Sequence, residues 1–237
     1  MPTAFITGAS RGLGLEFTRQ YAAEGWRVFA ACRDPAGAND LRDIAAAAED
    51  RVRILTLDVT DHERVESLAR ELAGETIDLL LNNAGVMEPH DITFGNMDYG
   101  MWAGIFEINL LAPTHMAEAF VDHVAGSGRK LIVTLSSGLG SVALNEAGSR
   151  LAPGKLYMYR TSKAAVNMVM RGLSFELKDR GVTSVVVSPG HVRTDMGGPK
   201  ARLGPEESIA SLRELIDGLS IADSGKFFSH DGGELPW

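Results

Sequence analysis

Short apolar runs alternate with longer segments of helical periodicity from one end of this 237-residue chain to the other. The apolar runs show no polar alternation, which is typical of strands buried on both faces of a parallel sheet. The periodic segments between them would form helices that cover those faces through right-handed crossovers. The sequence therefore predicts an α/β fold, a doubly wound parallel sheet of about seven strands with helices on both faces. Its length fits a single domain over residues 1–237.

We expect strands at residues 3–7, 27–32, 53–57, 77–81, 130–135, 183–187 and 226–229. We expect helices at residues 12–24, 39–48, 62–73, 97–124, 155–179 and 206–218. Residues 138–154 and 190–205 are rich in Gly, Pro and Ser, and we expect two long loops there. Both loops follow the carboxyl ends of expected strands, where ligands bind in open α/β sheets, so they are candidates for the functional site.

The composition excludes several classes of function. The formal net charge of −8 disfavours nucleic acid or an anionic membrane as partner. Cys32 is the only cysteine, so an intramolecular disulfide and a thiolate zinc site are excluded, and the six histidines show no metal-ligand spacing. No apolar stretch approaches the roughly 20 residues that span a bilayer. We therefore expect a cytoplasmic protein with no metal, nucleic acid or membrane partner.

A glycine-rich turn follows the first expected strand and opens the first helix, with the sequence Thr7-Gly8-Ala9-Ser10-Arg11-Gly12-Leu13-Gly14. Glycine allows a tight turn and a close approach of the backbone to a pyrophosphate, and the start of the helix adds N–H donors. A strand, this turn and a helix in succession predict a Rossmann-like NAD(P)-binding domain. The residues expected to contact the cofactor here are Gly8, Ser10, Arg11, Gly12, Leu13 and Gly14.

Tyr159 and Lys163 lie four residues apart in an expected helix. Residues at this spacing share one helix face, so a phenol and an ammonium group would project side by side. A lysine beside a tyrosine favours the phenolate and lowers the phenol pKa, which suits an acid/base near neutral pH. The pair alone is also common on solvated helix faces. The nucleotide-binding turn is what makes a catalytic interpretation the better one.

The spacing of the glycine-rich turn, T-G-x-x-x-G-x-G, resembles that of the short-chain dehydrogenase/reductase family, and further motifs follow in that family's order over essentially the whole chain. These motifs are Asp58-Val59, Asn82-Asn83-Ala84-Gly85, Asn109, Ser136-Ser137, Tyr159-x-x-x-Lys163, and Pro189-Gly190 with Thr194. The resemblance implies further cofactor contacts from Asp58, Val59, Asn83, Ala84, Gly85, Tyr159, Lys163, Pro189, Gly190, Val192 and Thr194.

The resemblance also implies a catalytic tetrad. Tyr159 would exchange a proton with the carbonyl or hydroxyl oxygen of the substrate, and Lys163 would lower the pKa of Tyr159 and hold the nicotinamide ribose. Ser137 would hydrogen-bond the substrate oxygen. Asn109, at a distortion in the fourth helix, would hold a water that links Lys163 to solvent.

Two of these assignments have competitors. Ser136 is the weaker candidate for the catalytic serine, because Ser137 better matches the family's spacing to the small residues that follow. An insertion at about residues 145–154 lengthens the distance from Ser137 to the tyrosine. Tyr157 lies six residues before Lys163 and would face another side of the helix, so we interpret it as a pocket or packing residue.

The residues after the second strand favour NADP(H) over NAD(H). An acidic residue there would hydrogen-bond the ribose 2′-OH and repel a 2′-phosphate, but the chain has Cys32 and Arg33. Arg11 adds a second guanidinium group from the glycine-rich turn, and forked donors of this kind match phosphate oxygens. Asp34 weakens the positive field slightly, and both arginines could instead be solvated surface charges.

Three local segments resemble the sniffer and C-factor type of carbonyl reductase within the family: residues 159–163, 189–198 and 231–237. This resemblance implies NADPH-dependent carbonyl reduction or, alternatively, a signalling or redox-sensing protein that binds NADP(H). In the expected pocket segments, 87–94, 139–144 and the loop from Met196, no charged anchor stands out for a carboxylate or phosphate substrate, which favours a small neutral carbonyl or alcohol substrate. The resemblance further implies a homodimer or homotetramer formed through helices 97–124 and 155–179. An extended-type epimerase or dehydratase would need a larger C-terminal substrate region, so we do not expect that class.

Overall fold

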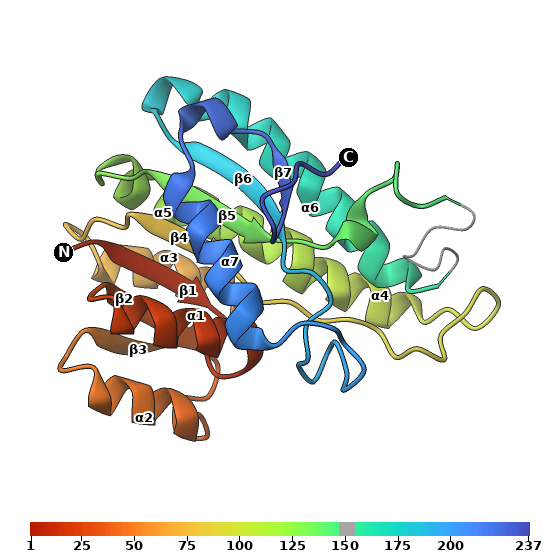
Figure 1. Cartoon of the computed structure of the whole chain (residues 1–237), viewed down its shortest axis with the longest axis horizontal. Helices are drawn as coiled ribbons and strands as arrows, with labels where there is room; N and C mark the ends of the chain where they lie inside the picture. Colours follow the sequence, from red (N-terminus) through yellow and green to blue (C-terminus); the bar gives the residue numbers. More distant parts are fainter. Residues whose placement is uncertain (147–154) are drawn as a thin grey trace.

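The structure is a computed structural model of the chain that describes residues 1–146 and 155–237. It contains a sheet of seven parallel strands in the order β3-β2-β1-β4-β5-β6-β7 (Figure 1). The strands are β1 Thr3–Thr7, β2 Arg27–Cys32, β3 Val52–Thr56, β4 Leu79–Asn82, β5 Leu131–Leu135, β6 Thr183–Ser188 and β7 Phe227–Ser229. The order reverses between β1 and β4, and this is the place where ligands bind in doubly wound sheets.

Helices cover both faces of the sheet, and α1 and α7 cross in front of it in Figure 1. The helices are α1 Gly12–Ala23, α2 Asn39–Ala47, α3 His62–Glu71, α4 Tyr99–Phe106, α5 Ala112–Ala125, α6 Tyr157–Glu176 and α7 Pro205–Gly218. One apolar core joins α1, α2 and α7 to the sheet, and a second joins α3 and α5 to the opposite face. Helix α6 packs against β6 and β7 in a third, smaller cluster. The expected doubly wound fold is confirmed.

Successive residues of β1 explain why its sequence shows no polar alternation. Ala4 and Ile6 belong to the core under α1, whereas Phe5 belongs to the core under α3 and α5. Phe5 packs there against Phe29 and Phe120, with ring centroids 6.2 and 4.8 Å away. A strand with apolar contacts on both faces needs an apolar residue at every position.

The predicted helix at 97–124 is interrupted, and the interruption lies at Asn109. Helix α4 ends at Phe106, a π-helical segment η1 follows at Glu107–Leu111, and α5 begins at Ala112. Pro113 has no N–H group, so it cannot make the ordinary hydrogen bond to the carbonyl four residues earlier. That carbonyl belongs to Asn109. The missing bond accounts for the wider turn, as is common for π-bulges.

Several strand ends lie one or two residues from their predicted positions. The strand predicted at 77–81 begins at Leu79 and continues to Asn82. Asp78 stands just before it and accepts a hydrogen bond from the N–H of Thr3 at 2.9 Å. The predicted loop at 138–154 begins with a 3₁₀ turn, η2 Gly138–Gly140, while the expected insertion at 145–154 falls almost entirely outside the described residues.

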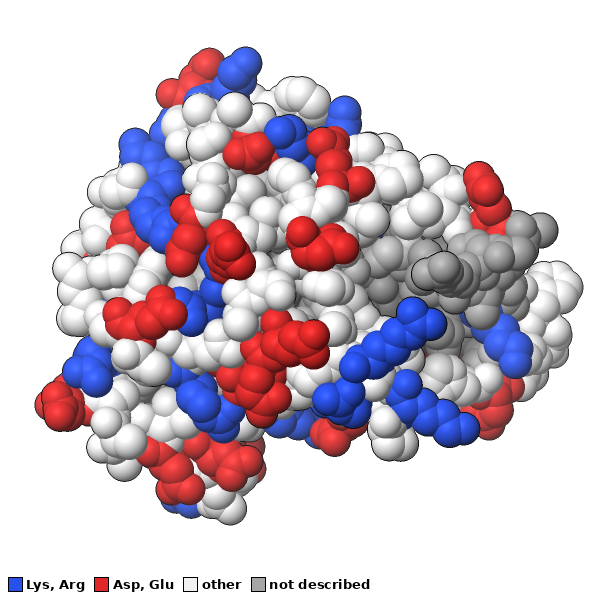
Figure 2. Space-filling model, in the orientation of Figure 1, with Lys and Arg blue, Asp and Glu red and all other residues white. Residues whose placement is uncertain are grey.

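On the face shown in Figure 2, acidic and basic side chains are interspersed rather than gathered into one large field. No helix in the described part of the chain is long and apolar enough to cross a membrane.

Candidate active site

A cleft of about 270 Å³ lies at the carboxyl ends of the strands, where the strand order reverses. Most of the residues expected to contact a cofactor line it: Gly8, Ser10, Arg11, Gly12, Leu13, Arg33, Asp58, Val59, Asn83, Ala84, Gly85, Tyr159, Lys163, Pro189 and Thr194. Lining residues that were not on that list are Cys32, Leu57, Val86, Ile108, Leu135, Ser136, Asp195 and Met196. The structure thus brings together residues from segments spread over the whole sequence.

The glycine-rich turn has the geometry of an anion cradle. Gly8 and Gly12 adopt φ angles of +67° and +55°, which favour glycine. A Cβ atom at Gly14 would collide with the carbonyl oxygen of Gly8, so this glycine allows α1 to pack tightly against the turn. Arg11 is the N-cap residue of α1 and makes no side-chain capping bond. The first N–H groups of the helix are therefore suited to an anionic ligand.

The Asn-Asn-Ala-Gly segment braces this cradle from the side of β4. The side-chain Nδ2 of Asn83 donates to the carbonyl oxygens of Thr7 at 2.8 Å and Gly8 at 3.2 Å. In return, the hydroxyl oxygen of Thr7 accepts the N–H groups of Asn83 at 3.0 Å and Ala84 at 3.1 Å. Four hydrogen bonds fix the turn in advance of any ligand. Asn83 is therefore a brace in the polypeptide as well as a residue of the cleft wall.

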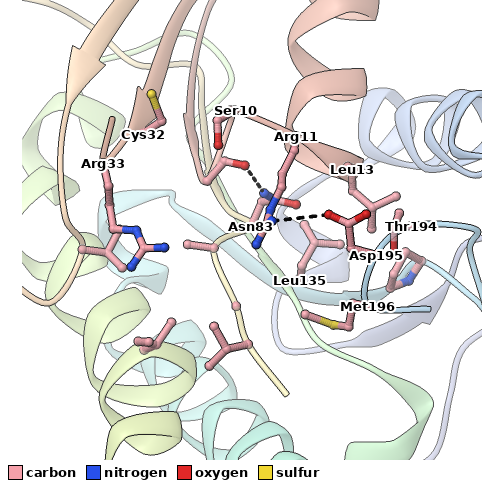
Figure 3. A pocket seen from close by; sticks show the side chains of 18 of the residues that line it. Ser10, Arg11, Leu13, Cys32, Arg33, Asn83, Leu135, Thr194, Asp195 and Met196 are labelled. Carbon is pink, nitrogen blue, oxygen red and sulfur yellow. Dashed lines mark hydrogen bonds and ion pairs between the residues drawn. The ribbon is translucent and has the colours of Figure 1, made fainter. Parts of the chain in front are cut away.

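Charged side chains line the part of the cleft formed by the glycine-rich turn and the end of β2, which we call the β2 end; Figure 3 shows Arg33 on one side of it and Arg11 with Asp195 on the other. Arg33 is exposed there, after the last residue of β2. The guanidinium of Arg11 forms an ion pair at 3.3 Å with Asp195 on the far side of the cleft. Asp58 is turned toward Thr60, whose N–H and hydroxyl donate to it at 3.0 and 2.8 Å. Asp34 accepts the N–H of Gly37 at 3.1 Å, within its own turn.

The opposite part of the cleft, the α6 end, contains Tyr159 on the first turn of α6. This side chain is only 8% exposed. Burial raises the pKa of Tyr159 to about 12; a hydrogen bond from Ser137 opposes the rise, and the negative charge of Glu88 adds to it. The phenol is thus held in its protonated form.

Lys163 lies one turn further along α6 and is 5% exposed. Its Nζ donates to the carbonyl oxygen of Leu135, at the end of β5, at 2.8 Å, and lies 5.7 Å from the ring centroid of Tyr159. Burial lowers the pKa of Lys163 to about 8. The expected lowering of the Tyr159 pKa is not met in the polypeptide by itself, where burial raises that pKa. The ammonium of Lys163 is directed at the carbonyl of Leu135.

Asn109 connects three elements of the site. Its side-chain oxygen accepts the N–H of Val86 at 2.9 Å, and its Nδ2 donates to the carbonyl of Val86 at 2.8 Å and to the hydroxyl of Ser162 at 2.9 Å. Both N–H groups of the side-chain amide are therefore occupied, and Pro113 cannot supply the ordinary helical donor to the backbone carbonyl of Asn109. The expected distortion at Asn109 is confirmed.

The two adjacent serines lie differently. Ser137 interacts with Tyr159, and its hydroxyl also accepts the N–H of Leu139 at 3.1 Å. Ser136 lines the cleft, and its buried hydroxyl has no hydrogen-bond partner among the described residues. The contact with Tyr159 favours Ser137 for the catalytic position. Tyr157, half-buried, does not line the cleft.

Some expected site residues stand behind the cleft wall rather than in it. Gly14, Asn109, Ser137, Gly190 and Val192 are outside the lining. Gly190 has a φ angle of +79°, and a Cβ atom there would collide with His230 and Leu203. Val192 is 4% exposed and pairs with Leu203 in a short parallel bridge. The segment that carries both is thus fixed by packing on the loop before α7.

The sequence interpretation missed the apolar wall residues and Glu88. Leu57 and Leu135 end predicted strands, Ile108 lies inside a predicted helix and Val86 follows the Asn-Asn-Ala-Gly segment, but nothing in their residue types marks them as wall residues. Glu88 is 2% exposed, which is rare for a carboxylate, and accepts hydrogen bonds from two N–H groups of α6.

Among residues 1–146 and 155–237, no group of three or more His, Cys, Asp or Glu is placed to hold a metal ion.

Comparison with known proteins agrees with this fold. The family model described as short chain dehydrogenase matches residues 2–202. The C-signal protein of Myxococcus xanthus is 36% identical over 173 residues, which cover 73% of this chain and all of that protein. The carbonyl reductase Sniffer of D. melanogaster superimposes with a TM-score of 0.90 at 28% identity over all of both chains. The NADPH-bound carbonyl reductase from chicken fatty liver also gives a TM-score of 0.90, at 31% identity over 100% of this chain and 99% of that one.

The parallel sheet, the braced glycine-rich turn and the buried tyrosine and lysine define a short-chain oxidoreductase, and the chain belongs to the short-chain dehydrogenase family. Within that family it resembles the sniffer-type carbonyl reductases in structure and C-signal in sequence.

Proposed function

We propose that the protein is an NADP(H)-dependent carbonyl reductase in which Tyr159 exchanges a proton with the substrate oxygen. The observation that carries this proposal is the placement of Tyr159 and Lys163, both almost fully buried, in the wall of a cleft that begins at a phosphate-type cradle. If these two residues belonged to an ordinary solvated helix face, the ammonium and the phenol would be exposed, because burying polar groups costs free energy. Perturbed groups in a cleft are typical of catalytic sites.

The residues of the cleft fit a dinucleotide. The glycine-rich turn and the start of α1 would receive the pyrophosphate, with Thr194 beside them. Arg33 and Arg11 at the β2 end would receive a 2′-phosphate, and no acidic residue ends β2 to repel it. The NADPH-bound chicken carbonyl reductase supports the same choice. When bound, NADPH supplies a hydride.

The polypeptide would handle the proton. Tyr159 would donate its phenolic proton to the carbonyl oxygen of the substrate, and the Ser137 hydroxyl would hydrogen-bond the same oxygen as negative charge develops on it. Lys163, held at the Leu135 carbonyl, would stabilise the phenolate left on Tyr159. Lys163 would then return a proton to the phenolate, and a water held at the carbonyl of Asn109 would replace that proton on Lys163 from solvent.

A neutral substrate fits the walls next to Tyr159. Val86, Ile108 and Met196 bring apolar side chains to the cleft, and carbonyl reduction is the activity in the names of two structural relatives. We infer that the substrate is a small aldehyde, ketone or quinone.

We also infer that the protein self-associates. Met168 and Phe175 on α6 and Leu111 before α5 expose apolar side chains on the helices expected to form the contact.

The test compares two tyrosines on one helix turn. Purified protein is supplied with NADPH and a panel of aldehydes, ketones and quinones, and the loss of NADPH absorbance is followed. Tyr159→Phe is expected to lower kcat by about 10² to 10⁴-fold while it binds NADPH normally. Tyr157→Phe is the matched control and should keep wild-type turnover. Equal turnover in wild type and Tyr159→Phe would refute the assignment.

The likeness to C-signal favours a second candidate, an NADP(H)-binding signalling or redox-sensing protein. Such a protein would need the nucleotide cradle but no acid/base. It would bind NADPH and show no turnover with any carbonyl of the panel. Turnover of any carbonyl of the panel by the wild type therefore separates the two functions.

A further inference from the structure

Glu88 is a buried carboxylate that holds the start of the catalytic helix from another part of the chain. It lies in the segment after β4 and is 2% exposed. Its Oε1 accepts the N–H of Met158 and its Oε2 accepts the N–H of Tyr159, each at 2.9 Å. Both oxygens act as acceptors, as an ionised carboxylate does.

Helix α6 needs this acceptor because it has no cap of its own. Its N-cap residue, Leu156, is in the left-handed region at φ 57° and offers no side-chain acceptor. The other carboxylate caps differ: Asp61 caps α3 and Asp98 caps α4 from the adjacent position, and both are exposed. A buried carboxylate is costly unless its partners are well placed, so a simple cap does not explain the choice of this residue.

The segment 86–88 also joins two members of the predicted tetrad. The amide of Asn109 bonds both backbone groups of Val86, and two residues later Glu88 bonds the backbone of Tyr159. Ser162, on the next turn of α6, completes this set of contacts because its hydroxyl accepts a hydrogen bond from the amide of Asn109. The π-helical turn, the segment after β4 and the first turns of α6 thus form one hydrogen-bonded frame around the phenol.

We propose that Glu88 is a positioning residue for proton transfer, which fixes the first turn of α6 and so holds the phenol of Tyr159 where it meets the substrate oxygen. This proposal rests on the proposed carbonyl reduction with Tyr159 as acid. Glu88 does not line the cofactor cleft, so it acts through Tyr159 rather than through the nucleotide.

The charge of Glu88 supports this role. It faces Tyr159 from the segment after β4, while Lys163 faces Tyr159 from the same helix and Ser137 faces it from the end of β5. The negative charge of Glu88 adds to the effect of burial in raising the pKa of Tyr159. A phenol that keeps its proton is the correct form for reduction, in which Tyr159 donates.

The test uses Glu88→Gln and Glu88→Ala in the full chain, with Asp61→Ala as matched control for the loss of a carboxylate cap. We expect Glu88→Gln to lower kcat for NADPH-dependent reduction by up to about 100-fold, because a small displacement of a catalytic group has an effect of this size. The alkaline limb of the kcat–pH profile should move to lower pH, and the Kd for NADPH should not change. Asp61→Ala should change neither kcat nor the profile.

Glu88→Asp keeps the charge and should restore the alkaline limb while kcat stays reduced, because the shorter side chain cannot reach both N–H groups. Wild-type kcat and an unshifted profile in Glu88→Gln would overturn the proposal, and so would a mere loss of thermal stability with unchanged kinetics. If Glu88→Ala does not fold, the Gln and Asp variants decide.

A second readout needs no turnover. The ¹³C signal of labelled Tyr159, assigned by its loss in Tyr159→Phe, should begin its shift to the phenolate at lower pH in Glu88→Gln than in wild type. If the wild type reduces no carbonyl but this signal moves, the proposed function fails and the link from Glu88 to Tyr159 stands. If carbonyls are reduced but the signal and kcat of Glu88→Gln match wild type, the link fails and the function stands.

Discussion

At the β2 end of the cleft the arginine side chains lie in solvent, whereas at the α6 end the ionisable groups are buried among hydrogen-bonded partners. Arg11 and Asp195 are 76% and 82% exposed, but Tyr159 and Lys163 are 8% and 5% exposed. Exposed charges interact weakly and are screened by salt, while burial shifts pKa values and makes each contact costly to lose. The β2 end is therefore suited to choosing and holding a nucleotide, and the α6 end to chemistry.

The largest loss of activity is expected when the ammonium group at the α6 end is removed. Lys163→Met keeps the length of the side chain but removes the positive charge that would stabilise a phenolate on Tyr159. We expect kcat to fall by about 100-fold or more, in the range of a lost acid/base contribution. Steady-state kinetics measure the effect. Lys155→Met, an exposed lysine just before α6, is the control and should leave kcat unchanged.

The same variant tests the burial of Lys163 through stability. The pKa of Lys163 is lowered from 10.5 to about 8, so between these values the unfolded chain binds more protons than the folded one. Stability from this group therefore rises with pH across that window, by about 3 kcal/mol, relative to Lys163→Met. Denaturant unfolding of both proteins at pH 7 and pH 10 measures it. A constant difference between them would show that Lys163 is not desolvated.

A smaller effect is expected at the β2 end. Arg33→Ala should weaken NADPH binding by about tenfold, leave NADH binding unchanged and keep kcat, because one exposed charge-assisted contact is lost. Fluorescence titration with both nucleotides measures this. Arg42→Ala removes an exposed arginine of α2 outside the cleft and should have no effect. A similar loss for NADH would argue against a 2′-phosphate contact.

The smallest effect concerns the ion pair across the cleft. Asp195→Asn frees the guanidinium of Arg11, and we expect NADPH to bind up to about fivefold more tightly, since exposed ion pairs contribute little. The gain should shrink as salt is added. Nucleotide titrations at low and high ionic strength check it, and weaker binding in the variant would mean that Asp195 itself helps to hold the nucleotide.

The sequence was sufficient for the fold because its signals are local. The strands at 3–7 and 27–32 have the observed bounds, since each apolar run stops at turn residues. The distortion at Asn109 was expected from the resemblance. Pro113 is the residue in the sequence that favours it, because it lacks the N–H group that would bond the carbonyl of Asn109 in an ordinary helix. These features depend on neighbours along the chain.

Long-range contacts within the site could not be predicted in the same way. The i, i+4 spacing places Tyr159 and Lys163 on one helix face, but it does not reveal that Lys163 reaches the carbonyl of Leu135. Nor does it reveal the depth of burial, which set the direction of the Tyr159 pKa opposite to expectation. Glu88 acts on a backbone about 70 residues further along, and no periodicity marks such a contact.

The hydrogen bond from Lys163 to Leu135 ties the ammonium group to the end of a central strand of the sheet rather than to a loop. A segment at the cleft that carries neither Leu135 nor Lys163, such as the one from Met196, can therefore change without moving this ammonium group. Directed evolution of substrate range would accordingly begin with libraries confined to that segment.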